Sequence, residues 1–258
     1  MYKKKKVIAI ANQKGGVGKT TTAINLAASF AKLNYKTLII DLDPQANSTT
    51  GLNALSERGV YSIFSKDYKD IHLLPQKTKI EGLDIIASDM NLSGVDLELA
   101  NAQSREYVLK AAIEELEHYE YILIDCPPSL SLLTVNALAA AHNLLIPMQC
   151  EFYSLEGLSN LLKTVKLINK NFNGKLSILG ILLTMFDKRN RLTMQVEKDV
   201  RSHLDKVVFD TVIPRNVRVS EAPSHGIPVI LYDPQSLGAI AYIKLAKEIL
   251  KKGNIKCQ

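Results

Sequence analysis

The chain has 258 residues, of which 47% are hydrophobic and 22% charged, and its formal net charge is +6. A chain of this length and composition can bury a large apolar core, which excludes disordered and collagen-like proteins. The three cysteines, an odd number at wide spacings, indicate neither a disulfide framework nor a zinc site, and no apolar run is long enough to span a membrane. We therefore expect a cytoplasmic protein.

Short apolar runs rich in β-branched residues alternate along the chain with segments of helical periodicity. Runs of this kind are typical of strands that are buried on both faces of a sheet. The predicted strands are residues 7–11, 37–40, 83–87, 121–124, 144–148, 178–184 and 207–213. The alternation predicts an α/β fold, a doubly wound and mostly parallel sheet flanked by helices, in a single domain over residues 1–258. Residues 51–105 are less regular, and we expect them to form an excursion from the core.

A glycine-rich loop follows the first predicted strand and leads directly into an amphipathic helix. Glycines let the backbone approach a phosphate, and the unpaired N–H groups of a helix N-terminus attract negative charge. Lys19 can reach the terminal phosphates of a nucleotide, and the Thr20 hydroxyl is placed to bind Mg²⁺. The usual P-loop has a glycine six positions before its lysine, but Gln13 stands there. The predicted nucleotide-binding residues of the loop are Lys14, Gly15, Gly16, Val17, Gly18, Lys19, Thr20 and Thr21.

Two further predicted strands end in carboxylates. The run 121–124 leads to Asp125, where a Walker B residue would hold Mg²⁺, usually through water. The run 37–40 leads to Asp41 and Asp43, whose spacing places them on the same side of the chain. We expect both strands beside the first one, at the carboxyl edge where open α/β sheets bind ligands. The alternatives are a strand-end Asp that only caps a helix and a simple Asp-Pro turn.

Residues 14–21 resemble the deviant Walker A motif, K-G-G-x-G-K-T, of the ParA/MinD group of P-loop ATPases. Residues 41–45 resemble the D-x-D-P-Q switch of that group, and residues 212–218 resemble its loop near the adenine. Residues 220–228 resemble a motif of its Soj-like members. The resemblance implies that Lys14 reaches the partner's ATP in a sandwich homodimer, that Asp43 orients the attacking water, and that Pro214 and Asn216 contact adenine. It predicts Lys14, Lys19 and Asp43 as catalytic residues. The predicted cofactors are ATP, bound by the loop, and Mg²⁺, bound by Thr20 and Asp125.

The positive charge is concentrated in one internal segment. Residues 160–218 hold twelve Lys and Arg against five acids, a net +7, whereas the remaining excess lies at the lysine-rich ends and the rest of the chain is acidic. No recognition-helix or zinc-finger motif appears, so we expect contacts to the backbone of double-stranded DNA without sequence preference. A dimer would double the few contacts of one protomer. The candidates are Arg189 and Arg218, which the Soj-like resemblance supports, with Lys188, Arg191, Arg215, Lys163 and Lys166.

Other branches of the same group bind membranes or carry an iron–sulfur cluster. Cys126 and Cys150 lack the sequence contexts of the cluster branch, and the tail after the last helical segment has little apolar surface for a membrane. We therefore predict a Soj-like ParA ATPase that acts with a ParB-type partner in chromosome or plasmid segregation. It would be nucleoid-associated, without stable membrane association and without an N-terminal DNA-reading domain. A MinD-like membrane-positioning ATPase is the main alternative, and an ATPase that positions another cargo is a third.

Overall fold

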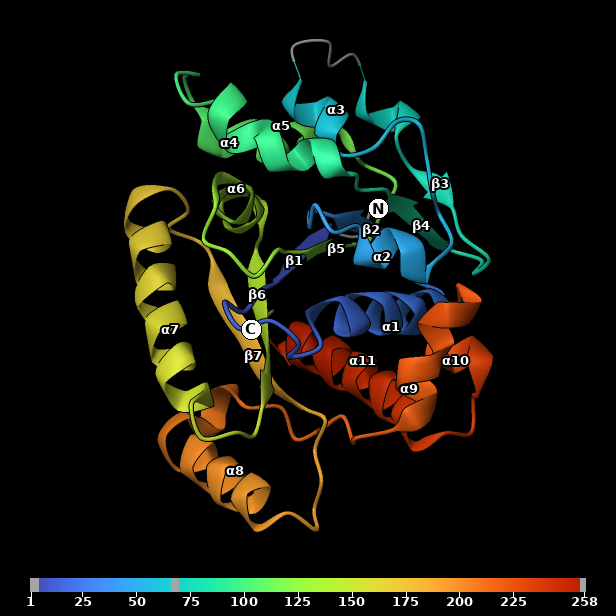
Figure 1. The fold of residues 1–258 in the computed structure, drawn as a ribbon, viewed down its shortest axis with the longest axis vertical. Coiled ribbons are helices and arrows are strands. Elements are labelled where there is room, and N and C mark those ends of the chain that lie inside the picture. Colours follow the sequence, from blue (N-terminus) through green and yellow to red (C-terminus); the bar gives the residue numbers. More distant parts are fainter. Residues whose placement is uncertain (1–4, 66–69, 256–258) are drawn as a thin grey trace.

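Buried apolar runs form one seven-stranded sheet in the part of the chain that the computed structural model describes, residues 5–65 and 70–255. The strand order is β3-β4-β2-β5-β1-β6-β7, and neighbouring strands are parallel except β3 and β4 (Figure 1). The strands are β1 (Lys6–Ile10), β2 (Thr37–Asp41), β3 (Gln76–Lys77), β4 (Leu83–Ile86), β5 (Tyr121–Asp125), β6 (Asn143–Gln149) and β7 (Ser177–Thr184). This confirms the predicted doubly wound, mostly parallel α/β sheet.

Helices connect the strands and cover both faces of the sheet. The α-helices are α1 (Lys19–Lys32), α2 (Asn47–Gly51), α3 (Tyr61–Phe64), α4 (Val95–Glu98), α5 (Val108–Glu115), α6 (Leu132–Ala140), α7 (Ser154–Asn171), α8 (Arg191–Leu204), α9 (Val217–Glu221), α10 (Val229–Tyr232) and α11 (Leu237–Ile255). Short 3₁₀ turns occupy Ile71–Leu73, Met90–Gly94, Arg105–Tyr107, Asp205–Val207 and Ala222–His225.

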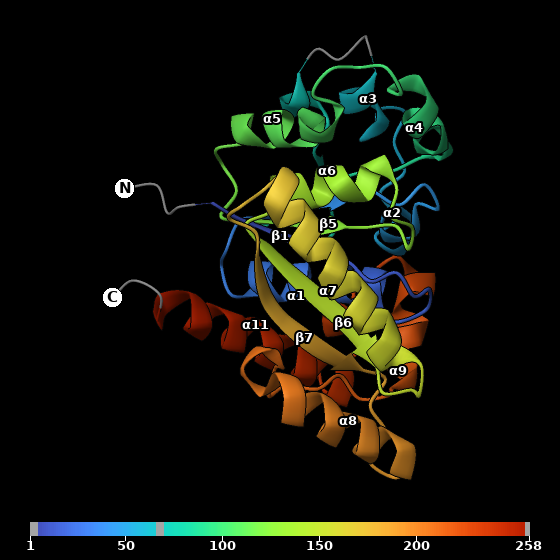
Figure 2. The same cartoon turned by 90° about the vertical axis from the view of Figure 1, so that its left-hand side faces the viewer.

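The strands separate two apolar clusters because successive side chains point to opposite faces. Val7 and Ala9 of β1 belong to the cluster that α5, α6, α7 and α8 cover. Ile8 and Ile10 belong to the other cluster, which α1, α10 and α11 cover. Figure 1 shows α1 and α11 side by side on their face, and Figure 2 shows α7 lying across β6 and β7 on the other. Both faces are thus buried, as the unbroken apolar runs predict.

The structure differs from the expectations in two places. The predicted strand at 207–213 is wrong, because this segment forms one isolated bridge with β7, between Val208 and Ile181, and no continuous ladder. The backbone N–H groups of Asp210 and Thr211 donate instead to the carboxylate of Glu248 on α11, at 2.9 and 3.0 Å. The order of the strands also differs, since β5 lies beside β1 but β2 lies one strand farther away, beyond β5.

The segment 51–105 is joined closely to the core. It supplies β4, which pairs with β2 inside the sheet, and the short antiparallel strand β3 at its edge. Side chains of its helical turns, among them Ile63 and Ile71, are buried in the cluster beneath α5. The irregular sequence therefore reflects short elements within the α/β layers.

Candidate nucleotide-binding site

The glycine-rich loop joins β1 to α1 and forms one wall of a cavity of about 510 Å³. Gly16 and Gly18 have φ values of 74° and 87°, in the left-handed region where a side chain would be strained. Two neighbouring strand ends hold the loop. Thr184 Oγ1, at the end of β7, donates to Val17 O at 2.8 Å, and Gln149 Nε2, at the end of β6, donates to Gly16 O at 3.3 Å. The first turn of α1 is thereby fixed at the cavity.

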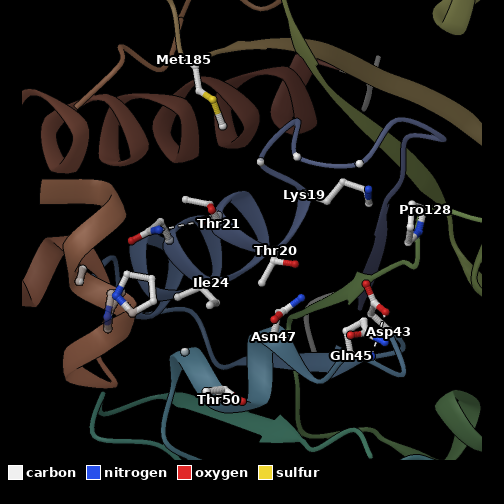
Figure 3. Close-up of a pocket in the computed structure, with 18 of the residues that line it drawn as sticks. Lys19, Thr20, Thr21, Ile24, Asp43, Gln45, Asn47, Thr50, Pro128 and Met185 are labelled. Carbon is white, nitrogen blue, oxygen red and sulfur yellow. Dashed lines mark hydrogen bonds between the residues drawn. The ribbon is translucent and has the colours of Figure 1, made fainter. Parts of the chain in front are cut away.

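The two lysines of the loop lie in different environments. Lys19 is buried, its Nζ donates to Lys14 O at 3.1 Å, and its side chain lines the cavity (Figure 3). Burial lowers the pKa of Lys19, while the carboxyls of Asp125 and Asp43 act against that shift. Lys14 is partly exposed, and its ammonium forms an ion pair with Glu151, which follows β6. Lys19 therefore belongs to the cavity, whereas Lys14 lies at the surface.

Asp41 and Asp125 end neighbouring strands, where they lie opposite each other in register and are fully buried. Asp41 Oδ2 accepts hydrogen bonds from the backbone N and Oγ1 of Thr49, at 2.8 and 2.7 Å. Asp125 Oδ2 accepts a hydrogen bond from Ser48 Oγ at 2.7 Å. Burial, reinforced by Asp41, raises the pKa of Asp125, and the hydroxyls of Ser48 and Thr20 oppose the increase. The site therefore concentrates negative charge that favours a cation.

One oxygen of this carboxylate is available for a ligand. Asp125 Oδ1 is buried and has no hydrogen-bond partner among the described residues. A buried oxygen without a partner costs free energy, so such an atom points to a ligand. Carboxylate and hydroxyl oxygens are the donors that Mg²⁺ prefers, and the Thr20 hydroxyl lies close enough to lower the pKa of Asp125. These residues fit a divalent cation.

Asp43 lies beside Lys19 and Thr20 at the same cavity (Figure 3). Its Oδ1 accepts a hydrogen bond from Gln45 N at 3.1 Å, and Ser88 Oγ donates to its carbonyl oxygen at 2.6 Å. Both contacts fix the turn that follows β2. The structure thus brings residues from three predicted motifs, the loop, the Walker B strand and the switch, to one site.

A second cavity of about 310 Å³ adjoins the first, and Gly18 and Met185 line both. Pro214 and Asn216, the predicted adenine contacts, line this second cavity. Asn216 caps α9, because its Oδ1 accepts a hydrogen bond from Val219 N at 3.3 Å. Its amide NH₂ can still donate to a base. The arrangement provides a phosphate-sized site and, next to it, a base-sized one.

Comparisons with known proteins agree with this geometry. Residues 5–178 match a family model described as an AAA domain. The sporulation initiation inhibitor protein Soj of Bacillus subtilis is 52% identical over 252 residues, 96% of this chain and 99% of that protein. The chromosome partitioning protein ParA of Caulobacter vibrioides is 49% identical over 253 residues, 96% of this chain and 94% of that one. The chain is a Soj-like member of the ParA/MinD group of ATPases.

A solved structure gives the same fold. Cobyrinic acid a,c-diamide synthase from Mycobacterium smegmatis, with a bound ATP analogue and magnesium, matches with a TM-score of 0.85 at 32% identity, covering 97% of this chain and 96% of that one. For the described residues of this Soj-like ATPase, no helix is both long and apolar enough to cross a membrane.

The predicted DNA-contacting residues of the Soj-like ATPase are all exposed, but they lie in several places. They are Lys163 and Lys166 on α7, Lys188 and Arg189 after β7, Arg191 at the start of α8, Arg215 before α9 and Arg218 within it. The structure brings Lys188, Arg189 and Arg215 to one groove. The lysines of α7 lie on the opposite face of the sheet from α9, so they do not belong to that groove.

The structure also shows residues that the sequence did not single out. Glu151 pairs with Lys14 from 137 positions away, and no local pattern indicates such a contact. Met185 lines both cavities with a φ of 49°, which is unusual for a residue with a side chain. The acidic partners of Arg189 and Arg218 could have been predicted from the sequence, because they are close neighbours. Asp187 lies two positions before Arg189, and Glu221 lies three positions after Arg218.

Proposed function

We propose that this ATPase acts in chromosome or plasmid partition, as an ATP-dependent homodimer that binds DNA without sequence preference and works with a ParB-type partner. The observation that carries the proposal is the pair of loop lysines, one buried at the cavity and one turned outward. The names of the curated relatives, a Soj and a ParA protein, support the partition role. We further propose that residues 1–258 act as a single ATPase domain in the cytoplasm, associated with the nucleoid.

The cavity residues have distinct proposed roles in ATP hydrolysis. Lys19 and the backbone of residues 14–21 would bind the phosphates. The Thr20 hydroxyl would hold Mg²⁺ directly, and Asp125 would hold it through water. Bound Mg²⁺ would neutralise charge that develops on the phosphates. Asp43 would orient the attacking water, and Pro214 and Asn216 would contact the adenine.

Lys14 gives a physical link between ATP and dimerisation. In the single protomer its ammonium is paired with Glu151 and remains 38% exposed. In a dimer, the same ammonium would exchange this carboxylate for phosphate oxygens of the partner's ATP, a more highly charged ligand. We expect Lys14→Gln to bind ATP and remain monomeric in analytical ultracentrifugation, whereas Lys32→Gln on the exposed end of α1 should dimerise like the wild type. Normal dimerisation of Lys14→Gln would contradict the proposed role.

Sedimentation separates the DNA-binding proposal from the MinD-like alternative. The protein is centrifuged with Mg²⁺ and either ATP or ADP, once with duplex DNA of unrelated sequences and once with anionic liposomes. We expect ATP-dependent sedimentation with every DNA and none with liposomes. Sedimentation with liposomes alone would favour a membrane-positioning ATPase.

A further inference from the structure

A basic groove lies beside the proposed adenine cavity, on the side away from α1. It has a volume of about 660 Å³ and lies between the loop after β7, the loop before α9 and the start of α11. Its charged residues are Lys188, Arg189, Arg215, Lys244, Asp187 and Asp210. Four cations against two acids give the groove a net charge of +2. Lys244 is exposed and lies outside the basic segment 160–218 in the sequence.

Backbone hydrogen bonds fix the two loops against each other. Phe186 N donates to Ile213 O at 2.9 Å, and Arg215 N donates to Phe186 O at 3.1 Å. The loops that carry Arg189 and Arg215 are therefore held together, although the two residues are 26 positions apart in the sequence. The groove therefore rests on two joined loops, from which the cationic side chains extend, Arg189 with 89% of its side chain exposed.

One acid of the groove occupies the donors that a phosphate would use. Arg189 donates from Nε and Nη2 to the two carboxylate oxygens of Asp187, at 3.0 and 2.9 Å. Arginine binds a phosphate with the same two-pronged geometry. These hydrogen bonds hold the pKa of Asp187 well below its usual range, with Arg215 adding to the effect, so this carboxylate is charged at neutral pH. A phosphate must therefore displace Asp187 or be bound by fewer donors.

We propose that this groove holds the DNA backbone, with Lys244 as a further phosphate contact and Asp187 as a carboxylate that competes with phosphate for Arg189. This inference rests on the proposed DNA-binding function. It adds that competition between Asp187 and phosphate limits the affinity for DNA. Competition keeps the affinity of one protomer low, so that DNA binding depends on the second groove that a dimer supplies. The positive charge would also suit an acidic protein partner. The experiment below distinguishes such a partner from DNA.

Two substitutions in the groove should change DNA affinity in opposite directions. Asp187→Asn keeps an oxygen that can accept the hydrogen bond from Arg189 N, seen at 3.0 Å, so the turn is preserved while the charge is removed. Lys244→Gln removes one cation. The matched controls are Glu197→Gln, which removes the acid of the Arg201 ion pair on α8, and Lys247→Gln, one turn farther along α11 and outside the groove.

Binding to duplex DNA is measured by fluorescence anisotropy with Mg²⁺ and a slowly hydrolysed ATP analogue, over a series of salt concentrations. One phosphate contact changes affinity by about fivefold at 0.15 M salt and changes the slope of log K against log[salt] by about 0.9. We expect Asp187→Asn to bind more tightly with a steeper slope. Lys244→Gln removes one contact from each protomer of the dimer, so it should bind about 30-fold more weakly with a slope that is shallower by about 2. Both controls should match the wild type.

The outcomes separate this inference from the function on which it rests. If the wild type binds DNA but Asp187→Asn binds equally or more weakly, the acid orients Arg189 and does not compete with phosphate. If neither groove variant changes DNA binding, the groove serves another partner. If the wild type and both variants fail to bind any DNA while still forming ATP dimers, the proposed DNA-binding function itself is wrong.

Discussion

The carboxyl group of Asp43 should control how fast the protein hydrolyses ATP and leaves DNA. It lines the cavity beside Lys19, and positioned acids or bases typically contribute about 10²- to 10⁴-fold to a reaction rate. We expect Asp43→Ala to retain ATP binding, to release phosphate about 100-fold or more slowly, and to accumulate as a DNA-bound dimer. Phosphate release and sedimentation with DNA measure the two effects.

A second substitution at the same position separates the charge of Asp43 from its structural role. Asp43→Asn keeps an oxygen that can accept the hydrogen bond from Gln45 N, so the turn after β2 should be preserved. If both variants hydrolyse ATP slowly, the carboxylate is required. If Asp43→Ala stays monomeric with ATP, Asp43 is needed to form the dimer and not to hydrolyse ATP within it.

The buried acid pair predicts a dependence of stability on pH. Burial, with Asp41 as the second cause, raises the pKa of Asp125 from 3.8 to about 7. Because the folded protein holds this proton more tightly than the unfolded chain, the stabilisation is complete below about pH 4 and is lost as the pH rises to about 7. Asp125→Asn removes this titration, so its stability relative to the wild type should increase with pH.

Urea unfolding without nucleotide or Mg²⁺ measures the effect. Between pH 5 and pH 8 we expect the free energy of unfolding of Asp125→Asn to gain on that of the wild type by on the order of 2 kcal/mol. Glu57→Gln, which changes an exposed acid, should show no comparable gain. A constant difference between Asp125→Asn and the wild type over this range would contradict the raised pKa.

The contact between α9 and α11 should control the shape of the adenine cavity. A Cβ on Gly238 would lie 2.2 Å from Val219 Cγ2, and α9 begins directly after Asn216. We expect Gly238→Ala to destabilise the protein by about 1–3 kcal/mol through overpacking and to weaken ATP binding by displacing α9. Adding Val219→Ala to this variant should restore much of the lost stability and of the lost ATP binding. Thermal unfolding and titration with a fluorescent nucleotide test this, and strictly additive losses would show that the two side chains do not collide.

The sequence predicts an element well where the burial of that element requires a clear pattern of apolar residues. Strands such as Tyr121–Asp125 are buried on both faces, so their apolar runs are unbroken, and the loop before α1 needs glycines at positive φ. The strand expected at 207–213 could not be rejected, because the competing acceptor, Glu248, lies about 40 positions away. The place of β2 beyond β5 is a matter of strand order, for which the sequence has no local pattern.

The candidate site divides in the same way. Lys19, Thr20 and Asp43 could be placed together because each follows a strand whose carboxyl end must lie at one edge of a parallel sheet. The pairing of Lys14 with Glu151 could not be predicted, since it depends on how β6 continues into α7. Contacts between distant loops, unlike motifs, are visible only in the folded chain.

At the scale of the whole molecule, DNA affinity should depend on how many phosphates the two protomers contact together. Arg218 is 53% exposed, but it is held by Glu221 at 2.9 Å and by Asp233 at 3.5 Å. If Arg218 contacts a phosphate, Arg218→Gln removes one contact from each protomer and two from a dimer. We therefore expect weaker binding by the same factor on every DNA sequence, because phosphate contacts carry no sequence information.

The salt dependence makes this prediction quantitative. Loss of two phosphate contacts should reduce the slope of log K against log[salt] by about 2 for the ATP dimer. Arg58→Gln, which removes an exposed arginine outside the basic segment, is the matched control and should leave the slope unchanged. An Arg218→Gln dimer with the wild-type slope would remove Arg218 from the DNA-binding surface, and a loss confined to one DNA sequence would show that Arg218 reads bases.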